Sequence, residues 1–253
     1  MEPASERLVN AVVTGGTRGL GLGLAQSLVR RGASVAVTYR HDAAAAEKAR
    51  QDLESHLQPG RSVLILQGDA GDPRVVERHC RGIREALGPV TVLVNNAGIM
   101  PRQEFEAISD ARWDETIRVN LNAAFYWSSR VLPDMKEAGW GRIVNISSIA
   151  ARGGGVVGPH YAASKAGLLG LTRYSARELG PWGITVNAIA PAFIQDAGIF
   201  TNLSAEQKED LRAKIVVPRL GLVRDVVRAF EYLLDTPFVT GVCLDVNGGA
   251  FMI

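Results

Sequence analysis

The fold is decided by the stretch Thr14-Gly15-Gly16-Thr17-Arg18-Gly19-Leu20-Gly21. It follows a short apolar run, Leu8–Thr14, and opens a segment with helical spacing over 19–31. Glycines let the backbone turn tightly between a strand and a helix, and the first N–H groups of that helix then face the turn. Such a turn binds a pyrophosphate well, because the free N–H groups and the helix dipole favour an anion. The alternative is a glycine-rich turn with a purely structural role.

Short apolar runs alternate with amphipathic segments along the rest of the chain. Segments 19–31 and 73–87 have helical spacing, and Pro73 behind Asp72 is typical of a helix start. Continuous apolar strands that alternate with helices indicate a parallel sheet covered on both faces. We therefore predict one α/β domain over residues 1–253, a three-layer doubly wound fold. About seven parallel strands are expected, at Leu8–Thr14, Ser34–Tyr39, Val63–Gln67, Val90–Asn95, Arg142–Ser147, Ile184–Ala190 and Val239–Val246.

Two stretches break this alternation. Residues 148–160 are rich in glycine, and residues 191–217 form a long connection with a helical piece near 204–215. Both begin at the carboxyl ends of predicted strands, where parallel sheets bind ligands. Long ordered connections are often functional, so we predict that 191–217 is a lid over the substrate. Its apolar residues would line the substrate or only pack the lid onto the domain; they are Ile194, Ile199, Phe200 and Leu203.

Composition argues against several classes of function. A net charge of +2 gives no electrostatic reason to expect a nucleic acid or a membrane surface as partner. No apolar run reaches the ~18–20 residues of a membrane-spanning helix, and the N-terminus lacks the apolar core of a secretory signal. Cys80 and Cys243 form no Cys-x-x-Cys motif, and the histidines show no metal-binding spacing. We therefore expect a cytoplasmic protein without a metal.

The end of the second predicted strand bears on the choice of dinucleotide. It reads Thr38-Tyr39-Arg40, and no carboxylate follows until Asp42. An NAD-specific site places an acidic side chain here on the ribose 2′-OH, whereas arginine suits a 2′-phosphate. Arg18, within the glycine loop, can approach the same region. The two arginines favour NADP, unless both are ordinary surface cations.

Five motifs, in order, resemble the short-chain dehydrogenase/reductase family. They are Thr14-Gly15-x-x-x-Gly19-x-Gly21, Asn95-Asn96-Ala97-Gly98, Val119-Asn120, Ser148 and Tyr161-x-x-x-Lys165. The tyrosine and the lysine stand one helical turn apart, a spacing that alone decides nothing. The resemblance extends over essentially the whole chain. It implies a Rossmann-type fold and a nicotinamide cofactor. It also implies a homotetramer that packs through the apolar C-terminal segment 238–253.

The resemblance also implies a catalytic set. Tyr161 would donate the proton in carbonyl reduction, and the charge of Lys165 would favour the phenolate form of Tyr161. Ser148 would hold the substrate oxygen, with Ser147 as its rival for that role. Asn120 would order a water that links Lys165 to solvent.

The same resemblance assigns the residues that bind the cofactor. Asp69 would contact the adenine amino group, with helix capping as the alternative, and Asn96 and Gly98 would lie along the adenosine ribose. Lys165 would bond the nicotinamide ribose. The predicted NADP site comprises Gly15, Thr17, Arg18, Gly19, Leu20, Gly21, Arg40, Asp69, Ala70, Asn96, Ala97, Gly98, Tyr161, Lys165, Pro191 and Ile194.

Within the family, the stretch 141–148 is most similar to 3-oxoacyl-(acyl-carrier-protein) reductases. The chain departs from that pattern at Ala192, where glycine is usual, and at Asp196, where threonine is usual. The arginines that dock the carrier protein would fall at Gly139 and Trp182.

These features predict NADPH-dependent reduction of a carbonyl to a secondary alcohol, on a 3-oxoacyl thioester linked to acyl-carrier protein or CoA. The alternative is a ketoreductase acting on a free ketone or a polyketide-type substrate. A hypothesis from a different class is a non-catalytic NADP-binding sensor or scaffold protein. Such proteins usually lack the tyrosine or the lysine, and both are present here. An NAD-linked alcohol dehydrogenase is disfavoured by Arg40.

Overall fold

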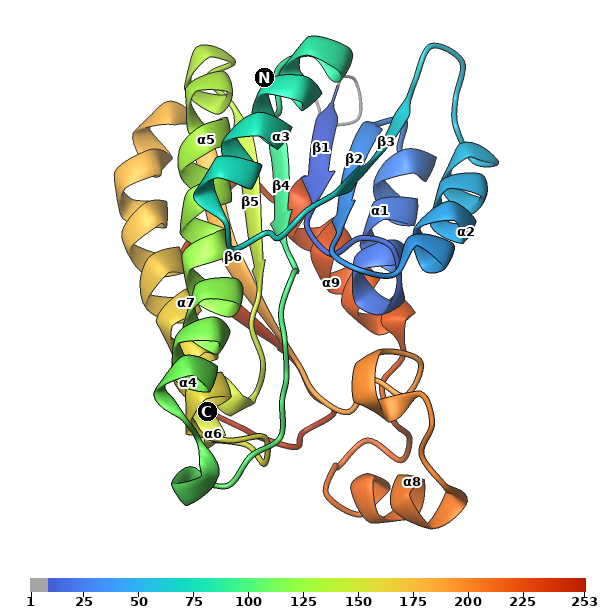
Figure 1. Ribbon diagram of the computed structural model, residues 1–253, viewed down its shortest axis with the longest axis vertical. Coiled ribbons are helices and arrows are strands. Elements are labelled where there is room, and N and C mark those ends of the chain that lie inside the picture. The colour runs from blue at the N-terminus through green and yellow to red at the C-terminus, as the bar shows by residue number, and fades with distance from the viewer. Residues whose placement is uncertain (1–8) are drawn as a thin grey trace.

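Seven strands form one parallel sheet in the computed structural model, which describes residues 9–253 apart from the side chain of Ile199 (Figure 1). The strands are β1 Asn10–Val13, β2 Ser34–Tyr39, β3 Val63–Gln67, β4 Val92–Asn95, β5 Gly141–Ile146, β6 Ile184–Pro191 and β7 Cys243–Val246. Their order in the sheet is β3-β2-β1-β4-β5-β6-β7. The chain therefore runs outward from β1 in one direction and from β4 in the other, and the topological switch point lies between these two strands.

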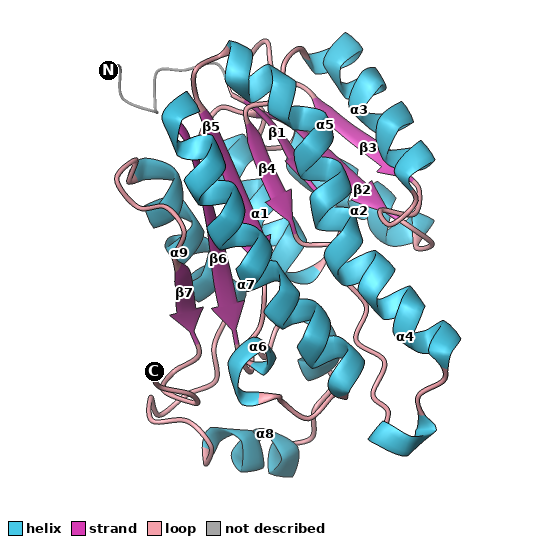
Figure 2. Ribbon diagram, turned by 90° about the vertical axis from the view of Figure 1, so that its left-hand side faces the viewer, coloured by secondary structure: helices cyan, strands magenta, loops and turns pink. Residues whose placement is uncertain are grey.

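Helices cover both faces of this sheet (Figure 2). The helices are α1 Gly19–Arg30, α2 Ala43–Glu54, α3 Pro73–Leu87, α4 Asp110–Ile117, α5 Ala123–Glu137, α6 Ala150–Gly153, α7 Pro159–Leu179, α8 Ala205–Arg212 and α9 Val223–Asp235. Shorter turns are η2 Phe105–Ala107, η3 Arg118–Asn122, η4 Gly180–Trp182 and η5 Gly198–Phe200. This arrangement confirms the predicted three-layer doubly wound fold.

The apolar core is divided by the sheet. Neighbouring residues of a strand point to opposite faces, so Val12 and Val13 belong to two different clusters. One cluster packs under α1 and α9 and includes Leu24 and Phe230. The other packs under α3, α5 and α7 and includes Trp127. Full burial of a large apolar side chain stabilises the fold by about 1.5–3 kcal/mol, so these two layers hold the sheet in place.

The predicted element boundaries match the structure to different degrees. β1, β4, β5 and β6 differ from their predicted bounds by one or two residues and β7 by four, and Leu8 lies outside the described residues. β2, β3 and α3 have the bounds expected from the sequence, and Asp72 accepts a hydrogen bond from the Arg74 N–H at the start of α3. β7 begins at Cys243 rather than at Val239. The preceding residues include Gly241, whose φ of 76° is incompatible with a strand. They reach β6 through the Asn187 side chain, which donates to the Val239 carbonyl.

Long connections leave the carboxyl ends of the strands. The connection that follows β6 contains η5 and α8, and the residues of α8 are exposed or half-buried. It returns to the body where the N–H groups of Val216 and Val217 donate to the Gly248 carbonyl, at 2.9 and 3.0 Å. Figure 2 shows α8 beyond the carboxyl edge of the sheet, apart from the two helical layers. The helical piece predicted near 204–215 is thus α8.

Candidate active site

The glycine loop joins β1 to α1 and is shaped by close backbone contacts. Gly15 has a φ of 64°, a conformation that favours glycine. A Cβ on Gly21 would lie 2.3 Å from the Gly15 carbonyl oxygen, so only glycine fits there. Among the described residues, no side chain caps the first turn of α1, and that turn carries no acidic residue. The helix N-terminus is therefore available to an anion beside the loop.

The Asn96 side chain stabilises the glycine loop through hydrogen bonds. Its Nδ2 donates to the carbonyls of Thr14 and Gly15, at 2.9 and 3.0 Å. The Thr14 hydroxyl in turn accepts from the N–H groups of Asn96 and Ala97. The loop after β4 is thereby fixed against the loop after β1, across the topological switch point. The contact of Asn96 with an adenosine ribose stays a prediction.

Tyr161 and Ser148 meet at the carboxyl end of β5. Tyr161 lies in the first turn of α7, and its hydroxyl is hydrogen-bonded to Ser148, which follows β5. Burial raises the pKa of Tyr161, and the hydrogen bond to Ser148 opposes that rise. Ser147 instead donates to the Lys165 carbonyl at 2.9 Å and is only 3% exposed. Ser148 therefore faces the tyrosine, whereas Ser147 anchors α7.

Lys165 is a buried cation one turn after Tyr161. Its Nζ donates to the Ile146 carbonyl at 2.8 Å and lies 5.7 Å from the centroid of the Tyr161 ring. Burial lowers the pKa of Lys165 to about 8, because a low-dielectric site penalises the charged form. A Cβ on Gly98 would lie 3.6 Å from this Nζ and 3.3 Å from Asn120 Oδ1. The glycine thus keeps the backbone close to both side chains.

Asn120 lies in η3, a π-helical turn between α4 and α5. Turns of this type occur frequently at functional sites. Its Nδ2 donates to the Ile99 carbonyl at 2.9 Å and to Ser164 Oγ at 3.1 Å, and its Oδ1 accepts from the Ile99 N–H at 2.7 Å. Asn120 therefore holds the loop that follows β4 beside α7. Its ordering of a water next to Lys165 stays a prediction.

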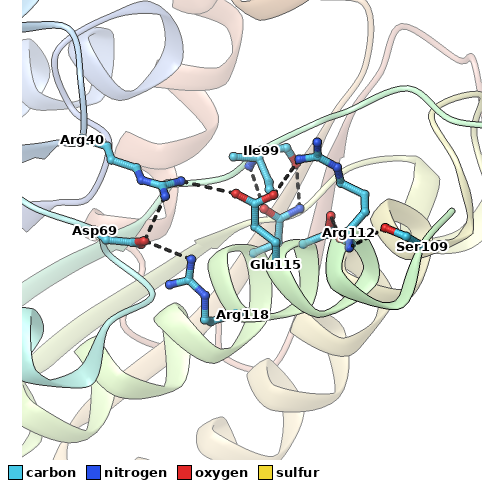
Figure 3. Close-up of polar contacts among 9 residues, drawn as sticks. Arg40, Asp69, Ile99, Ser109, Arg112, Glu115 and Arg118 are labelled. Carbon is cyan, nitrogen blue, oxygen red and sulfur yellow. Dashed lines mark hydrogen bonds and ion pairs between the residues drawn. The ribbon is translucent and has the colours of Figure 1, made fainter.

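Arg40 and Asp69 lie together at the ends of β2 and β3 (Figure 3). Their closest atoms, Arg40 Nη2 and Asp69 Oδ2, are 3.4 Å apart, and Arg118 Nη2 donates to the same oxygen at 3.0 Å. Burial alone would raise the pKa of Asp69. The hydrogen bonds from Arg118 and the Gly71 N–H, with the charges of both arginines, hold that pKa below its usual value. Asp69 is therefore ionised and does not cap α3, a role taken by Asp72.

Arg118 and Glu115 are site residues that the sequence did not reveal. Glu115 Oε1 lies 3.5 Å from Arg40 Nη1, and α4 brings it there from a distant part of the chain. A Cβ on Gly71 would lie 2.7 Å from Arg118 Nη1, so this glycine makes room for the guanidinium. No local spacing signals these contacts. Arg18, the other predicted arginine, has a side chain that is 80% exposed and lies 3.9 Å from Asp42.

Two more of the predicted cofactor residues lie where the chain leaves β6. Pro191 ends β6, and Ile194 is buried and forms an isolated bridge with Gly221. Asp196 Oδ1 accepts from the Val223 N–H at 2.9 Å, so it caps α9. The departure from threonine at this position thus has a structural use.

An ion pair between α6 and β7 is another contact that the sequence did not reveal. Arg152, on α6 just after Ser148, lies with its Nη1 2.6 Å from Asp245 Oδ2 on β7. Both side chains are largely buried, with exposed fractions of 15% and 20%. Phe193 and Phe200 meet edge to face in the connection that follows β6, with ring centroids 5.9 Å apart.

Metal and thiol chemistry have little support in the described part of the chain. Residues 9–253 contain no group of three or more His, Cys, Asp or Glu side chains that could hold a metal ion. Burial raises the pKa of Cys80 to about 12 and also raises the pKa of Cys243.

Within the described residues 9–253, every helix is too short or too polar to cross a membrane.

Known proteins resemble the chain along almost its whole length. A model of the short chain dehydrogenase family matches residues 9–208. The 3-oxoacyl-[acyl-carrier-protein] reductase of Salmonella typhimurium is 35% identical over 245 residues, which cover 96% of this chain and 97% of that protein. The reductase of the same name from Pseudomonas aeruginosa is 37% identical over 244 residues, 96% of this chain and 97% of that protein. These matches confirm the resemblance inferred from the motifs and support NADP as the cofactor. The chain belongs to the short-chain dehydrogenase family and is an oxidoreductase acting on carbonyl or hydroxyl groups.

Proposed function

We propose that the protein uses NADPH to reduce a 3-oxoacyl thioester to the corresponding 3-hydroxyacyl thioester. The observation that carries this proposal is the hydrogen bond between Tyr161 and Ser148, with the buried Lys165 one turn away. The relatives support it, because three that match over almost the full length are named 3-oxoacyl-[acyl-carrier-protein] reductases.

The residues around the switch point fit a bound dinucleotide phosphate. The open N-terminus of α1 and the glycine loop would hold the pyrophosphate. Arg18 and Arg40 would hold the 2′-phosphate, since guanidinium groups match phosphate geometry. Gly98 leaves the backbone close enough to Lys165 for a ribose to lie beside both.

Proton transfer would be the work of this chain's own side chains. When bound, NADPH supplies a hydride to the carbonyl carbon. The Ser148 hydroxyl donates a hydrogen bond to the substrate oxygen, and Tyr161 gives its proton to that oxygen as negative charge develops there. The raised pKa of Tyr161 keeps the proton in place until that moment. The Lys165 ammonium then stabilises the phenolate that remains.

The form of the thioester is less constrained. Gly139 and Trp182 stand where carrier-protein reductases would have docking arginines, and the Nζ of Lys136 lies 4.8 Å from the centroid of the Trp182 ring. A CoA thioester is therefore included in the proposal beside the carrier-protein thioester. The same missing arginines favour a free ketone as the second candidate substrate.

The test is NADPH consumption measured with three kinds of carbonyl: 3-oxoacyl groups on acyl-carrier protein, the same groups on CoA, and free ketones. We expect kcat/KM for a thioester to exceed that for the free ketones by about tenfold or more. A preference for free ketones would overturn the thioester assignment. NADPH binding without consumption of any carbonyl would identify a non-catalytic sensor or scaffold.

A further inference from the structure

Five charged side chains form one chain of ion pairs at the carboxyl edge of the sheet (Figure 3). In order they are Arg118, Asp69, Arg40, Glu115 and Arg112. The distances between successive charged atoms are 3.0, 3.4, 3.5 and 2.6 Å. Three positive and two negative groups alternate, and Arg40 stands in the middle.

Each of the two carboxylates has two arginine partners, one of its own and one that it shares. Asp69 has its own arginine in Arg118 at 3.0 Å, and Glu115 has its own arginine in Arg112 at 2.6 Å. Arg40 is shared between both carboxylates at the two longest distances. Arg40 is therefore the member of the chain that can leave while both carboxylates keep an ion pair.

Arg40 also stands at the end of β2, where this fold places the 2′ position of the adenosine ribose. In the structure its guanidinium reaches instead toward α4, where Glu115 holds it. A cofactor phosphate at the end of β2 would have to draw Arg40 away from that carboxylate. Glu115 would stay in place, since Arg112 keeps its other oxygen.

We propose that Glu115 is a specificity-determining residue, whose carboxylate competes with the 2′-phosphate of the cofactor for Arg40. The proposal rests on the proposed use of NADPH. Competition lowers the affinity for NADPH, but not for NADH, which has no phosphate to bind Arg40.

The size of the effect follows from exposure. The side chains of Arg40 and Glu115 are 40% and 31% exposed, and ion pairs of this kind are weak. A phosphate forms stronger charge-assisted hydrogen bonds with a guanidinium, so it wins the competition. Removing the competing charge should therefore tighten NADPH binding by only about threefold to fivefold.

The experiment compares Glu115→Gln with Asp114→Asn. Both remove one carboxylate from α4, but Asp114 forms no ion pair with any residue of the described range 9–253. Glutamine has nearly the helix propensity of glutamate, so α4 is preserved. Titration calorimetry with NADPH and with NADH gives the dissociation constants. We expect Glu115→Gln to lower Kd for NADPH about threefold to fivefold, and all other values to stay within about twofold of wild type.

The Arg40→Ser background separates this inference from the proposed function. In a protein that already carries Arg40→Ser, Glu115→Gln should no longer change Kd for NADPH. The guanidinium for which Glu115 and the phosphate compete is absent from that protein. The role of Glu115 would be overturned if Glu115→Gln and Asp114→Asn changed Kd for NADPH equally. It would also be overturned if Glu115→Gln lowered Kd for NADPH and for NADH by the same factor. Neither result would affect the proposed use of NADPH. If Arg40→Ser leaves the preference for NADPH over NADH unchanged, the proposed 2′-phosphate site fails, and the inference fails with it.

Discussion

Lys165 shows at the scale of one residue how burial prepares a group for chemistry. Its pKa falls from 10.5 to about 8 because the folded protein removes it from water. Between these two values the unfolded chain binds more protons than the folded protein, so this residue makes stability rise with pH across that window. Below it, Lys165 is charged in both states, and its burial opposes folding. The charge is thus kept at a cost in stability, as expected for a functional group.

We expect kcat/KM for NADPH to fall above about pH 8. This parameter reflects the protonation of groups in the free enzyme. Above about pH 8 Lys165 loses its proton, so no ammonium charge is left to stabilise the phenolate of Tyr161. Initial rates from about pH 6 to about pH 10 at fixed ionic strength provide the measurement. A profile that stays level through pH 8 would contradict the assigned role of Lys165.

Substitution of glycine by alanine is expected to change stability in opposite directions at Gly21 and at Gly170. In Gly21→Ala the new methyl would lie 2.3 Å from the Gly15 carbonyl oxygen, so the glycine loop must distort. We expect a loss of about 1–3 kcal/mol in the free energy of unfolding, together with weaker NADPH binding. A Cβ on Gly170, within α7, would meet no described atom within 4 Å. Gly170→Ala should stabilise the protein by about 0.5–1 kcal/mol.

Urea denaturation with NADPH titration measures both variants. A Gly21→Ala protein with wild-type stability and wild-type affinity for NADPH would show that the loop is not packed as described.

At the scale of elements, β7 and the residues after it are linked to α6 and to the connection that follows β6. Asp245 on β7 pairs with Arg152 on α6. The Gly248 carbonyl accepts hydrogen bonds from the end of the 191–217 connection. The position of α6 relative to Ser148 therefore depends on β7.

We expect Asp245→Asn to reduce the free energy of unfolding by about 1–3 kcal/mol, because Arg152 keeps its charge in a largely buried place. KM for the carbonyl substrate should rise, whereas Kd for NADPH should not change, since the glycine loop lies on another part of the sheet edge. Glu47→Gln is the control: it breaks an exposed pair with Arg50 on α2. If Asp245→Asn behaves like this control, the tie between β7 and α6 has no effect on the site.

Elements and site residues were predictable from the sequence to different degrees. Continuous apolar runs and local caps marked β2, β3 and α3, because the signals lie within each segment. The start of β7 was missed because Gly241 turns the backbone in an otherwise apolar run.

Contacts between distant segments could not be predicted in this way. Asp196 was noticed only as a departure from the family, and its partner Val223 lies 27 residues further on. Glu115 and Arg118 reach the ends of β2 and β3 only because α4 folds over that edge of the sheet.

Several large apolar side chains are exposed on the surface of the described residues 9–253. Tyr232, Phe238 and Val242 lie on or next to α9 and β7 and are 50%, 100% and 40% exposed. Phe125 on α5 and Tyr174 on α7 are 54% and 69% exposed. Exposed apolar groups favour association, and the family resemblance implies a homotetramer that packs through the C-terminal segment 238–253.

Light scattering should therefore give a mass near four times the 27.1 kDa of one chain. Phe238→Asp, which changes a fully exposed side chain and so should not disturb folding, is expected to halve that mass. A wild-type mass near one chain would refute the tetramer.

Tyr161 is assigned the transfer of a proton to the carbonyl oxygen of the substrate. Tyr161→Phe removes only the hydroxyl that is bonded to Ser148 and leaves the ring in place. The most direct measurement is single-turnover oxidation of bound NADPH by a 3-oxoacyl thioester, with Kd for NADPH measured on the same protein. We predict an unchanged Kd and a rate lower by about 10²–10⁴-fold, the range that a general acid contributes. A Tyr161→Phe protein that oxidises NADPH at the wild-type rate would contradict the claim, because the proton would then come from another group.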